Sequence, residues 1–252
     1  MRNNTDVIGV IPARYESSRL SHKLLRTVCG KPLIQWAWES ASKASLLDGL
    51  IIACDDAKIK QAAESFGATA VITSTQHQSG TDRIAEAIRD IDAKIVINIQ
   101  ADEPLMHHSI IDGLAREMVN NPATFMATVK KKIEAEEDIN NPNIVKLVCD
   151  KNDFAVYFSR YPIPYYRDSA AEKKYYKHLG IYAYTKDFLY TFKNLPVSYL
   201  ENAERLEQLR AIEAGYKIKT IETKFESIGV DTEEDLQRVE AALKARADRG
   251  NK

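Results

Sequence analysis

Short apolar runs alternate with amphipathic segments along the first half of the chain. The runs consist almost only of apolar residues and glycine, and they cover Val7–Ile11, Gly49–Ala53, Ala70–Ile72 and Ile95–Ile99. Such runs are typical of strands that are buried on both faces of a parallel sheet. Because helix-like segments separate them, the pattern predicts an α/β fold with a mostly parallel central sheet and helices on both faces.

The segments between these runs carry signals for helix starts and ends. Pro32 lies near the first position of one expected helix. Asp55 and Asp56 would cap a second helix, which ends near Gly67. A third helix is expected to begin at Gly80–Arg83.

The second half of the chain is richer in aromatic residues and changes pattern. Four further strands are predicted at Phe125–Val129, Ile144–Cys149, Phe154–Ser159 and Leu179–Tyr184. They suit a smaller antiparallel insert beside the main sheet.

The end of the chain returns to alternating helix and strand signals. Two prolines in the segment 161–168 exclude a central strand there and indicate a loop or lid, which we extend over 161–174. A helix at about 200–214, a strand at Tyr216–Ile221 and a final helix after Asp231 complete the prediction.

Charge and cysteine content narrow the class of protein. The chain has 35 Lys and Arg against 36 Asp and Glu, so no net charge attracts it to a nucleic-acid polymer or an anionic membrane. Cys29, Cys54 and Cys149 lack metal-ligand spacing, which indicates reduced, partly buried thiols. No apolar run approaches the roughly 18 residues of a membrane span, and the polar N-terminus indicates no signal peptide. We therefore expect a cytoplasmic protein.

The loop after the first predicted strand carries three cations, Arg14, Arg19 and Lys23. Open α/β sheets bind ligands at loops beyond the carboxyl ends of their strands. Cations at such a loop favour a polyanion, most simply a nucleotide triphosphate. A solvated basic loop is the alternative interpretation.

Two carboxylates are candidates for a magnesium site. Asp102 follows the fourth apolar run and should lie at the same sheet edge as the cationic loop. Mg²⁺ takes one or two protein carboxylates, and substrate phosphates complete its shell. The alternative is that Asp102 caps the turn before Pro104. Asp231 is expected to be the N-cap of the last helix, with Glu234 at its third position, and it matters for the site only if it faces Asp102.

Two further segments have both a functional and a structural interpretation. Gln78–Arg83 begins a helix, so its N–H groups can bind a base or a phosphate, or can simply be capped. His178 could be a base, a ligand or a satisfied surface histidine. Tyr182 could belong to the core, and Glu207 with Arg210 could form a surface pair.

Common motifs of other enzyme classes are absent from the sequence. It contains neither GxGxxG nor a P-loop, so neither a dinucleotide fold nor a P-loop NTPase is indicated. It also contains no HExxH, CxxC or GxSxG, so metalloprotease, redox and hydrolase functions have no supporting motif.

The informative segments occur in a characteristic order. They are Ile11–Tyr15 with Ser18–Leu20, Gly30–Pro32, His77–Arg83, Val96–Gln100 with Asp102–Pro104, Asn141–Asn143, Tyr157–Arg160, Ile163–Pro164, His178–Tyr182, Leu206–Arg210 and Gly229–Asp231. In this order and spacing, over roughly residues 7–243, the chain resembles the CMP-Kdo synthetase family, the 3-deoxy-manno-octulosonate cytidylyltransferases.

The resemblance implies a nucleotide-diphospho-sugar transferase-like fold and a homodimer. It implies transfer of CMP from CTP to the anomeric hydroxyl of Kdo with release of pyrophosphate, which activates the sugar for lipopolysaccharide biosynthesis. It also implies a single α/β domain over 1–252. Its parts would be a nucleotide-binding half at about 1–120, a sugar-binding and dimerisation insert at about 121–215, and a return to the main sheet at about 216–252.

The resemblance also implies a role for each candidate residue. Arg14, Arg19 and Lys23 would hold the triphosphate. Asp102 and Asp231 would hold Mg²⁺, and together with Lys23 and Arg14 they would form the catalytic set. The cytidine pocket would include Gln78, Ser79, Gly80 and Arg83, and the sugar acid would be surrounded by Gln100, His178, Tyr182, Glu207, Gln208 and Arg160.

The chain departs from the family pattern at two places. Ser21-His22-Lys23-Leu24-Leu25 stands where the family usually has Pro-Gly-Lys-Pro-Leu. Loss of the glycine stiffens the loop, loss of the prolines restores conformational freedom, and His22 adds an imidazole that could contact phosphate. Ala101 stands where the family usually has glycine, and it is strained if its φ is positive.

Two alternative functions remain beside Kdo activation. One is a cytidylyltransferase for a related acid sugar, such as 8-amino-Kdo or a sialic-acid-like substrate. The other is a catalytically impaired nucleotide-binding paralogue, which the altered loop would support.

Overall fold

A computed structural model describes residues 5–17, 19–168 and 172–250 of the chain. Ser18, which is part of the family resemblance, and residues 169–171 of the predicted lid loop lie outside the described residues. The contacts divide the chain into two compact units. Unit 1 comprises 1–112 and 226–252, and unit 2 comprises 113–225.

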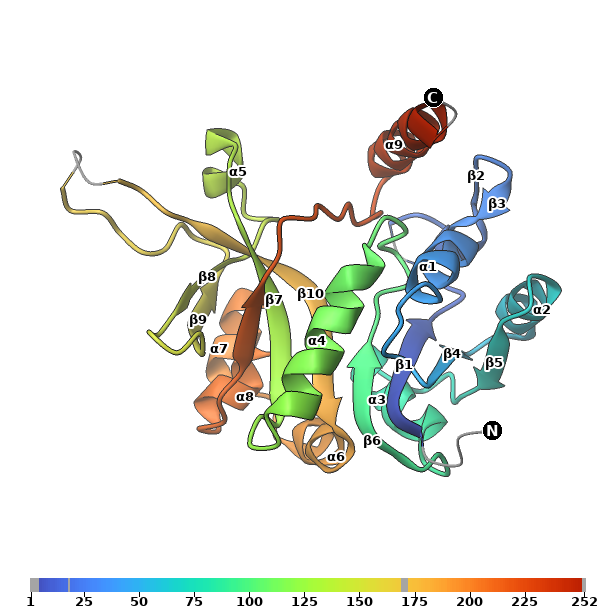
Figure 1. The fold of residues 1–252 in the computed structure, drawn as a ribbon, viewed down its shortest axis with the longest axis horizontal. Helices are drawn as coiled ribbons and strands as arrows, with labels where there is room; N and C mark the ends of the chain where they lie inside the picture. The colour runs from blue at the N-terminus through green and yellow to red at the C-terminus, as the bar shows by residue number, and fades with distance from the viewer. Residues whose placement is uncertain (1–4, 18, 169–171, 251–252) are drawn as a thin grey trace. The chain divides into compact units, whose positions relative to one another are not determined.

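The core of unit 1 is a parallel sheet of buried strands. Its order is β6 (Ala93–Asn98), β1 (Thr5–Ala13), β4 (Gly49–Cys54) and β5 (Thr69–Ile72), and every neighbouring pair is parallel. Val10 in the middle of β1 pairs with Ile51 on one side and with Asn98 on the other. The four strands predicted from the apolar runs are confirmed, and their carboxyl ends share one sheet edge because they run in parallel (Figure 1).

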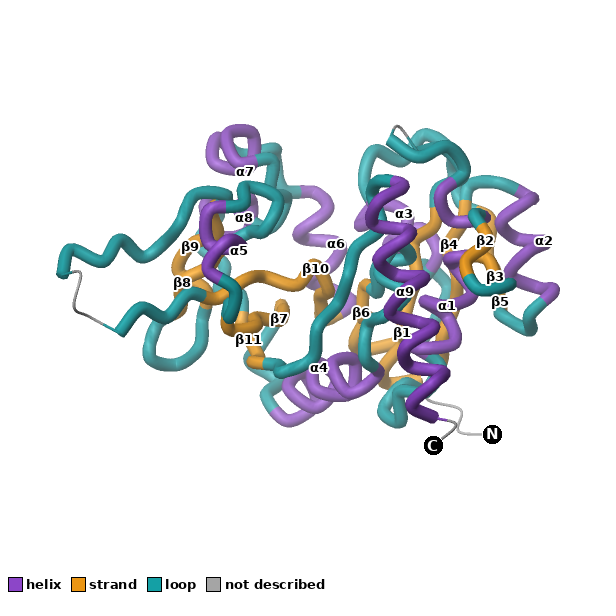
Figure 2. The backbone as a smooth tube through the Cα atoms, turned by 90° about the horizontal axis from the view of Figure 1, so that it is seen from above, coloured by secondary structure: helices purple, strands orange, loops and turns teal. Residues whose placement is uncertain are grey.

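Helices cover both faces of this sheet. They are α1 (Leu33–Ala41), α2 (Ala57–Ser65) and α3 (Gly80–Ala87), and α4 (His108–Asn120) begins in unit 1 and continues into unit 2. The last helix, α9 (Glu233–Gly250), packs against the short strand Thr27–Val28. The two views show α3 on one face of the sheet and α1 on the other (Figures 1 and 2). Leu33, Ile34 and Ala37 of α1 are fully buried, as their spacing predicts.

The helix starts in unit 1 agree only in part with the prediction. Asp56 caps α2, since its carboxylate accepts from Lys58 N at 2.7 Å. Asp55 is not a second cap. Its carboxylate accepts from Tyr15 N and from Arg83 instead. Pro32 is the N-cap residue of α1 and directly precedes its first helical residue, in agreement with the prediction.

A 3₁₀ turn and a hairpin connect β1 to α1. The turn η1 (Lys23–Leu25) precedes the hairpin of β2 (Thr27–Val28) and β3 (Lys31–Pro32). Cys29 and Gly30 between these strands both have positive φ, 47° and 79°. A two-residue hairpin turn of type I′ requires this sign at both positions, so Cys29 is exposed at a turn tip and is not partly buried as predicted.

Unit 2 is built on an antiparallel group of strands, as predicted. Its strands are β7 (Met126–Lys132), β8 (Lys146–Cys149), β9 (Ala155–Ser159), β10 (Tyr176–Thr185) and β11 (Lys219–Glu222). β7 pairs antiparallel with β10, and β8 pairs antiparallel with both β9 and β10. The exception is β11, which pairs parallel with β7.

The helices of unit 2 are short. They are α5 (Glu136–Asn140), α6 (Lys186–Asn194), α7 (Tyr199–Glu204) and α8 (Leu209–Glu213). The single helix predicted at about 200–214 is wrong, because Arg205 adopts a left-handed conformation with φ 54° and ends α7. The predicted strand at Tyr216–Ile221 begins later, at Lys219.

The helices are too short or too polar for a bilayer. Within residues 5–17, 19–168 and 172–250, none has the length and apolar character required to cross a membrane.

Candidate active site

Lys23, Asp102 and Asp231 converge at the carboxyl edge of the unit 1 sheet. Lys23 begins η1, Asp102 lies in the turn after β6, and Asp231 lies just before α9. The Lys23 ammonium donates to Asp102 Oδ2 at 2.8 Å and to Asp231 Oδ1 at 3.1 Å. The Lys23 side chain is only 10% exposed, whereas those of Asp102 and Asp231 are 34% and 44% exposed, so the ammonium is shielded from solvent and the carboxylates remain accessible. Three candidate residues from distant parts of the sequence therefore meet at one point.

The loop that supplies Lys23 also supplies a second cation. Arg19 Nη2 lies 3.0 Å from Asp231 Oδ1, although both side chains are largely exposed. A backbone bond from Val230 N to Asp102 O, 2.9 Å long, joins the segment before α9 to the turn after β6. This bond fixes the separation of the two acidic residues independently of their side chains.

The start of α9 is capped by residues other than those predicted, so the carboxylate of Asp231 is available to Lys23. Thr232 Oγ1 accepts from Asp235 N at 3.2 Å, and Asp235 Oδ2 accepts from Thr232 N at 3.1 Å. This reciprocal pattern makes Thr232 the cap and Asp235 its partner, so the predicted pair of Asp231 and Glu234 is wrong. The carboxylate of Asp231 is directed to Lys23 and Arg19 instead.

The two carboxylates fit a magnesium ion that is shared with a substrate. Asp102 Oδ2 and Asp231 Oδ1 both lie within 3.1 Å of the same cationic atom of Lys23, so they can face a single cation. The described side chains include no group of three or more His, Cys, Asp or Glu that could hold a metal by themselves. Mg²⁺ is commonly bound by one or two carboxylates together with substrate phosphates, which is the kind of donor set present.

Glu103 is half-buried beside this centre, and its Oε2 atom is shielded from solvent. Burial raises the pKa of its carboxyl group to about 7, and the neighbouring charges of Asp102 and Glu226 act in the same direction. A carboxyl group with this pKa is partly protonated near neutral pH, which limits the negative charge next to Asp102.

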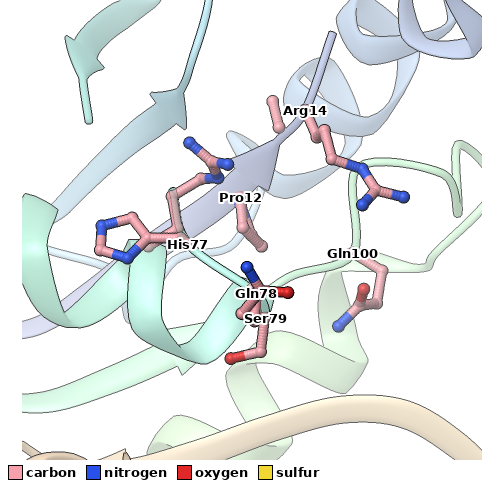
Figure 3. A pocket seen from close by; sticks show the side chains of 9 residues that line it. Pro12, Arg14, His77, Gln78, Ser79 and Gln100 are labelled. Atoms are coloured by element: carbon pink, nitrogen blue, oxygen red, sulfur yellow. The ribbon is translucent and has the colours of Figure 1, made fainter. Parts of the chain in front are cut away.

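A cavity of about 250 Å³ opens beside the cationic loop. It is lined by Pro12, Ala13, Arg14, His77, Gln78, Ser79, Gly80, Arg83 and Gln100. Figure 3 shows Arg14 and Gln100 on one side of this cavity, with Gln78 and Ser79 facing them. Pro12, Arg14 and Gln100 also line a second cavity of about 140 Å³, which includes Lys23 and Asp102. The two cavities therefore share a wall, which places a base-sized pocket next to the cation and carboxylate cluster.

The close fit of α3 against β1 gives the larger cavity its wall. Ser79 caps α3 and accepts from Asp82 N at 3.1 Å. A Cβ added at Gly80 would lie 3.3 Å from Pro12 Cγ, which is tighter than ordinary van der Waals contact. Glycine therefore lets the N-terminus of α3 approach the end of β1.

Arg83 is a buried support of this cavity. Its side chain is 4% exposed, and its guanidinium donates to Asp55 Oδ2 at 3.0 Å and to Thr73 Oγ1 at 2.7 Å. Asp55 Oδ1 in turn accepts from Tyr15 N at 2.8 Å. The ion pair thus ties the cationic loop to β4 and α3, a role of Asp55 that the capping interpretation missed.

His77 and Glu86 form a second supporting pair that the sequence analysis did not single out as site residues. His77 Nε2 is hydrogen bonded to Glu86 Oε2, which also accepts from Ser74 N at 2.9 Å. The bond from Ser74, followed by that from His77, lowers the pKa of Glu86. The position of His77 at the start of the His77–Arg83 motif was the only sequence signal for it.

His178 and Tyr182 lie on β10 of unit 2, with ring centroids 5.3 Å apart. His178 Nε2 is 2.9 Å from Thr128 Oγ1, and the Thr128 hydroxyl lies 2.8 Å from Ile181 O. If the hydroxyl donates to that carbonyl, it accepts from His178 Nε2–H, which leaves Nδ1 as an acceptor. Burial lowers the pKa of His178 to about 3, so the imidazole is neutral at physiological pH.

Other sugar-site candidates of unit 2 lie around the corner between α7 and α8. The Nε2 atom of Gln208 is buried without a hydrogen-bond partner, so it can donate to a ligand. Arg160 is already engaged, since its Nε donates to Glu204 O at 2.7 Å and its Nη1 to Pro142 O at 2.9 Å. Glu207 directly precedes Gln208 at the same corner. Gln100, the remaining candidate for the sugar site, belongs to unit 1.

The two departures from the family pattern have different conformations. His22 stands in the position of the usual glycine and adopts a left-handed conformation, with φ 51° and ψ 35°. Such a conformation costs a residue with a Cβ about 1–2 kcal/mol. Ala101 is not among the described residues with positive φ, so the conditional expectation of strain there is not met.

Comparison with known proteins gives a consistent result. The family model described as cytidylyltransferase matches residues 8–221. A 3-deoxy-manno-octulosonate cytidylyltransferase of Solibacter usitatus is 48% identical over 239 residues and covers 95% of each chain. The enzyme of that name from Syntrophobacter fumaroxidans is 47% identical over 241 residues, which are 94% of this chain and 96% of the relative.

Solved structures agree with these sequence relatives. A CMP:2-keto-3-deoxy-manno-octonic acid synthetase complexed with CTP superposes with a TM-score of 0.91 at 41% identity, covering 96% of this chain and 100% of the other. A glucose-1-phosphate thymidylyltransferase of Bacillus anthracis, described as putative, shares the fold with a TM-score of 0.66 at 16% identity, over 94% of each chain.

Proposed function

The chain belongs to the 3-deoxy-manno-octulosonate cytidylyltransferase family, and we propose that Lys23, Arg14, Asp102 and Asp231 form its catalytic centre. The enzyme activates Kdo by transfer of CMP from CTP. Pyrophosphate is the second product of this proposed reaction, because the bond between the α- and β-phosphates of CTP breaks. The observation that carries the assignment is the contact of Lys23 Nζ with both Asp102 and Asp231.

The chemistry requires positioning and charge neutralisation more than a covalent nucleophile. A sugar hydroxyl attacks the α-phosphorus in line with the departing pyrophosphate, so the two substrates must be held in a fixed orientation. In our proposal, Arg14, Arg19 and Lys23 bind the triphosphate and stabilise the negative charge that develops on its oxygens. Arg14 lines both cavities, and Lys23 lines the smaller one, which supports this role.

Asp102 and Asp231 are the residues that would hold Mg²⁺ in this scheme. When bound, the ion polarises the phosphoryl group and lowers the pKa of the attacking hydroxyl. In the structure the ammonium of Lys23 forms ion pairs with both carboxylates, and Arg19 forms a further ion pair with Asp231. With a cation there, Lys23 would be released from its two acidic partners and could bind phosphate oxygens.

The larger cavity is the proposed site of the cytidine. Gln78, Ser79 and Gly80 at the start of α3 present side-chain and backbone donors to this cavity. Arg83 lines the cavity as well, but its contacts with Asp55 and Thr73 make it a support of the wall more than a direct ligand.

The sugar acid is proposed to contact Gln100, His178, Tyr182, Glu207 and Gln208. The neutral imidazole of His178 and the unsatisfied amide of Gln208 support hydrogen bonds to sugar hydroxyls or carboxylate. Arg160 belongs to the same proposal, although the carbonyl oxygens of Glu204 and Pro142 already occupy its donors. We further propose that the enzyme acts as a cytoplasmic homodimer and that its product serves lipopolysaccharide biosynthesis.

Release of pyrophosphate from CTP in the presence of Mg²⁺ and Kdo tests the function directly. We expect Lys23→Ala to lower turnover by roughly 100-fold or more, on the scale of one preorganised charged contact. We expect Asp102→Asn to abolish Mg²⁺-dependent turnover while the circular dichroism spectrum stays unchanged. Lys43→Ala and Asp90→Asn, which alter exposed residues of unit 1, are the matched controls.

The outcomes separate the competing functions. Near-normal turnover of Lys23→Ala or Asp102→Asn would refute the catalytic centre. A panel that includes 8-amino-Kdo and a sialic acid tests the preferred sugar in the same assay. Tight CTP binding without pyrophosphate release from any acid sugar would indicate a nucleotide-binding paralogue.

A further inference from the structure

The rings of Tyr15 and His22 stack across the cationic loop. Their centroids are 4.2 Å apart, and their planes meet at 23°. Tyr15 directly follows Arg14, and His22 directly precedes Lys23. We propose that this stack, the His22–Tyr15 clasp, makes His22 a positioning residue that holds Arg14 and Lys23 in place for the triphosphate. The inference rests on the proposed role of these two cations in CTP binding.

Tyr15 is the anchored half of the clasp. Its backbone N donates to Asp55 Oδ1 at 2.8 Å, and its hydroxyl accepts from Lys58 Nζ at 2.9 Å. Asp55 is held by the buried guanidinium of Arg83. Tyr15 is therefore attached to the carboxyl edge of β4 through its backbone and to the start of α2 through its side chain, so its ring offers a fixed surface.

His22 is the strained half of the clasp. Its backbone is left-handed, a conformation that glycine adopts without a steric cost and histidine does not. Its carbonyl accepts from Leu25 N at 2.9 Å, so the same residue starts the 3₁₀ turn that carries Lys23. A glycine there would keep the backbone path but would offer no ring to Tyr15. The stack therefore provides a reason for a histidine in a conformation that disfavours it.

The clasp restrains the loop, which has no prolines at positions 21 and 24 to limit its conformations. Ser21 and Leu24 stand where the resemblance has prolines, and prolines limit the conformations of a free loop. A loop that is ordered before the ligand arrives loses less entropy on binding. We therefore expect the clasp to act on the affinity for CTP and on its KM, with little effect on turnover at saturating substrate.

A double-mutant cycle on CTP affinity tests the clasp. His22→Asn keeps a residue type that tolerates the left-handed region but removes the ring, Tyr15→Leu removes the other ring, and His22→Phe restores an aromatic ring at position 22. The energy of an aromatic pair corresponds to a change of about 2- to 12-fold in affinity. We expect each of the first two variants to weaken CTP binding by such a factor in isothermal titration calorimetry with Mg²⁺.

The coupling and the kinetic pattern distinguish positioning from a general structural effect. The double variant should bind no more weakly than the single ones, because both remove the same contact. The KM for CTP should rise with kcat within about twofold of the parent protein, and His22→Phe should recover most of the affinity. His108→Asn, which alters a stacked histidine pair away from the loop, is the matched control.

Trypsin provides a readout that does not depend on the reaction. The loop contains cleavage sites after Arg14 and Arg19, and local opening governs cleavage at such sites. Fragments that begin at Tyr15 or Leu20 should appear faster in His22→Asn than in the parent protein or His22→Phe.

Additive effects of the two ring deletions, or parental CTP affinity of His22→Asn, would overturn the clasp. Lys23→Ala in the same titration reports separately on the proposed function. If that variant binds CTP like the parent protein, the assignment of the triphosphate site fails whatever the result for His22.

Discussion

The cap of α9 lies one residue later in the sequence than predicted, and this difference determines whether Asp231 can take part in the site. Asp231 with Glu234 and Thr232 with Asp235 are both plausible capping pairs at the start of α9. The structure uses the second pair, and the carboxylate of Asp231 then contacts Lys23. A similar choice occurs at Asp55 and Asp56, where one residue caps α2 and the other binds Arg83. At both places the side chain next to the cap contributes to the site.

His178 should give the protein a specific dependence of stability on pH. Burial lowers its pKa from 6.5 to about 3 in the folded state, so below pH 6.5 the unfolded chain binds more protons than the folded one. Stability from this group is complete above pH 6.5 and declines as the pH falls toward 3. Between pH 7 and pH 5 the decline amounts to about 2 kcal/mol.

Urea denaturation at pH 5 and pH 7 measures this effect. The free energy of unfolding should fall less between these pH values in His178→Gln than in the parent protein, by about 2 kcal/mol. His108→Gln, at a partly exposed position on α4, serves as the control. An equal decline in the parent protein and in His178→Gln would show that the imidazole is not kept neutral by burial.

Single residues in the left-handed region determine where elements end. Arg205 ends α7 in this conformation, so the chain turns before α8 and places Glu207 and Gln208 at the corner. An arginine gives no sequence signal for such a turn, since glycine or asparagine is the usual residue. The prediction of one continuous helix failed for this reason. The capping box of Ser198 and Glu201, by contrast, is a recognisable start of α7.

Glycine at position 205 should therefore stabilise the corner between α7 and α8. Arg205→Gly removes the Cβ that is unfavourable at φ 54°. Its cost is the larger backbone freedom of glycine in the unfolded chain. We expect a net gain of about 0.5–1 kcal/mol in the free energy of unfolding, measured by urea denaturation. Arg205→Ala keeps the Cβ and loses the same side chain, so it should give no gain. Destabilisation by glycine alone would contradict the conformational argument.

Across the whole molecule, the accuracy of prediction follows the kind of interaction. Buried parallel strands were predictable because each is a short, nearly unbroken apolar run, and the sheet edge then placed Lys23 and Asp102 near each other. The contacts of Asp55 and His77 were not predictable, because ion pairs between a loop and a helix such as α3 depend on tertiary contacts that no local pattern reports. The stack of His22 on Tyr15 also depends on the path of the loop.

The surface of unit 2 supports the prediction that the whole molecule is a homodimer. Among the described strands β9 pairs only with β8, and beyond the bond from Ala155 N to Ile218 O at its start, no described strand pairs with its other edge. Val156 on β9 is 55% exposed, and Tyr161 and Tyr165 in the following loop are 78% and 87% exposed. Exposed apolar and aromatic side chains beside an open edge are typical of a surface that is covered by a partner.

Sedimentation equilibrium tests this assembly. We expect the parent protein to have twice the mass of a 28.4 kDa chain at micromolar concentration. Val156→Asp should shift it toward the monomer, because a desolvated carboxylate at an interface is unfavourable. Val119→Asp introduces the same charge at a similarly exposed position on α4 and should leave the mass unchanged. A monomeric parent protein would show that the homodimer prediction is wrong, whereas a dimer that tolerates Val156→Asp would place the interface on another surface, because the charge would then remain in solvent.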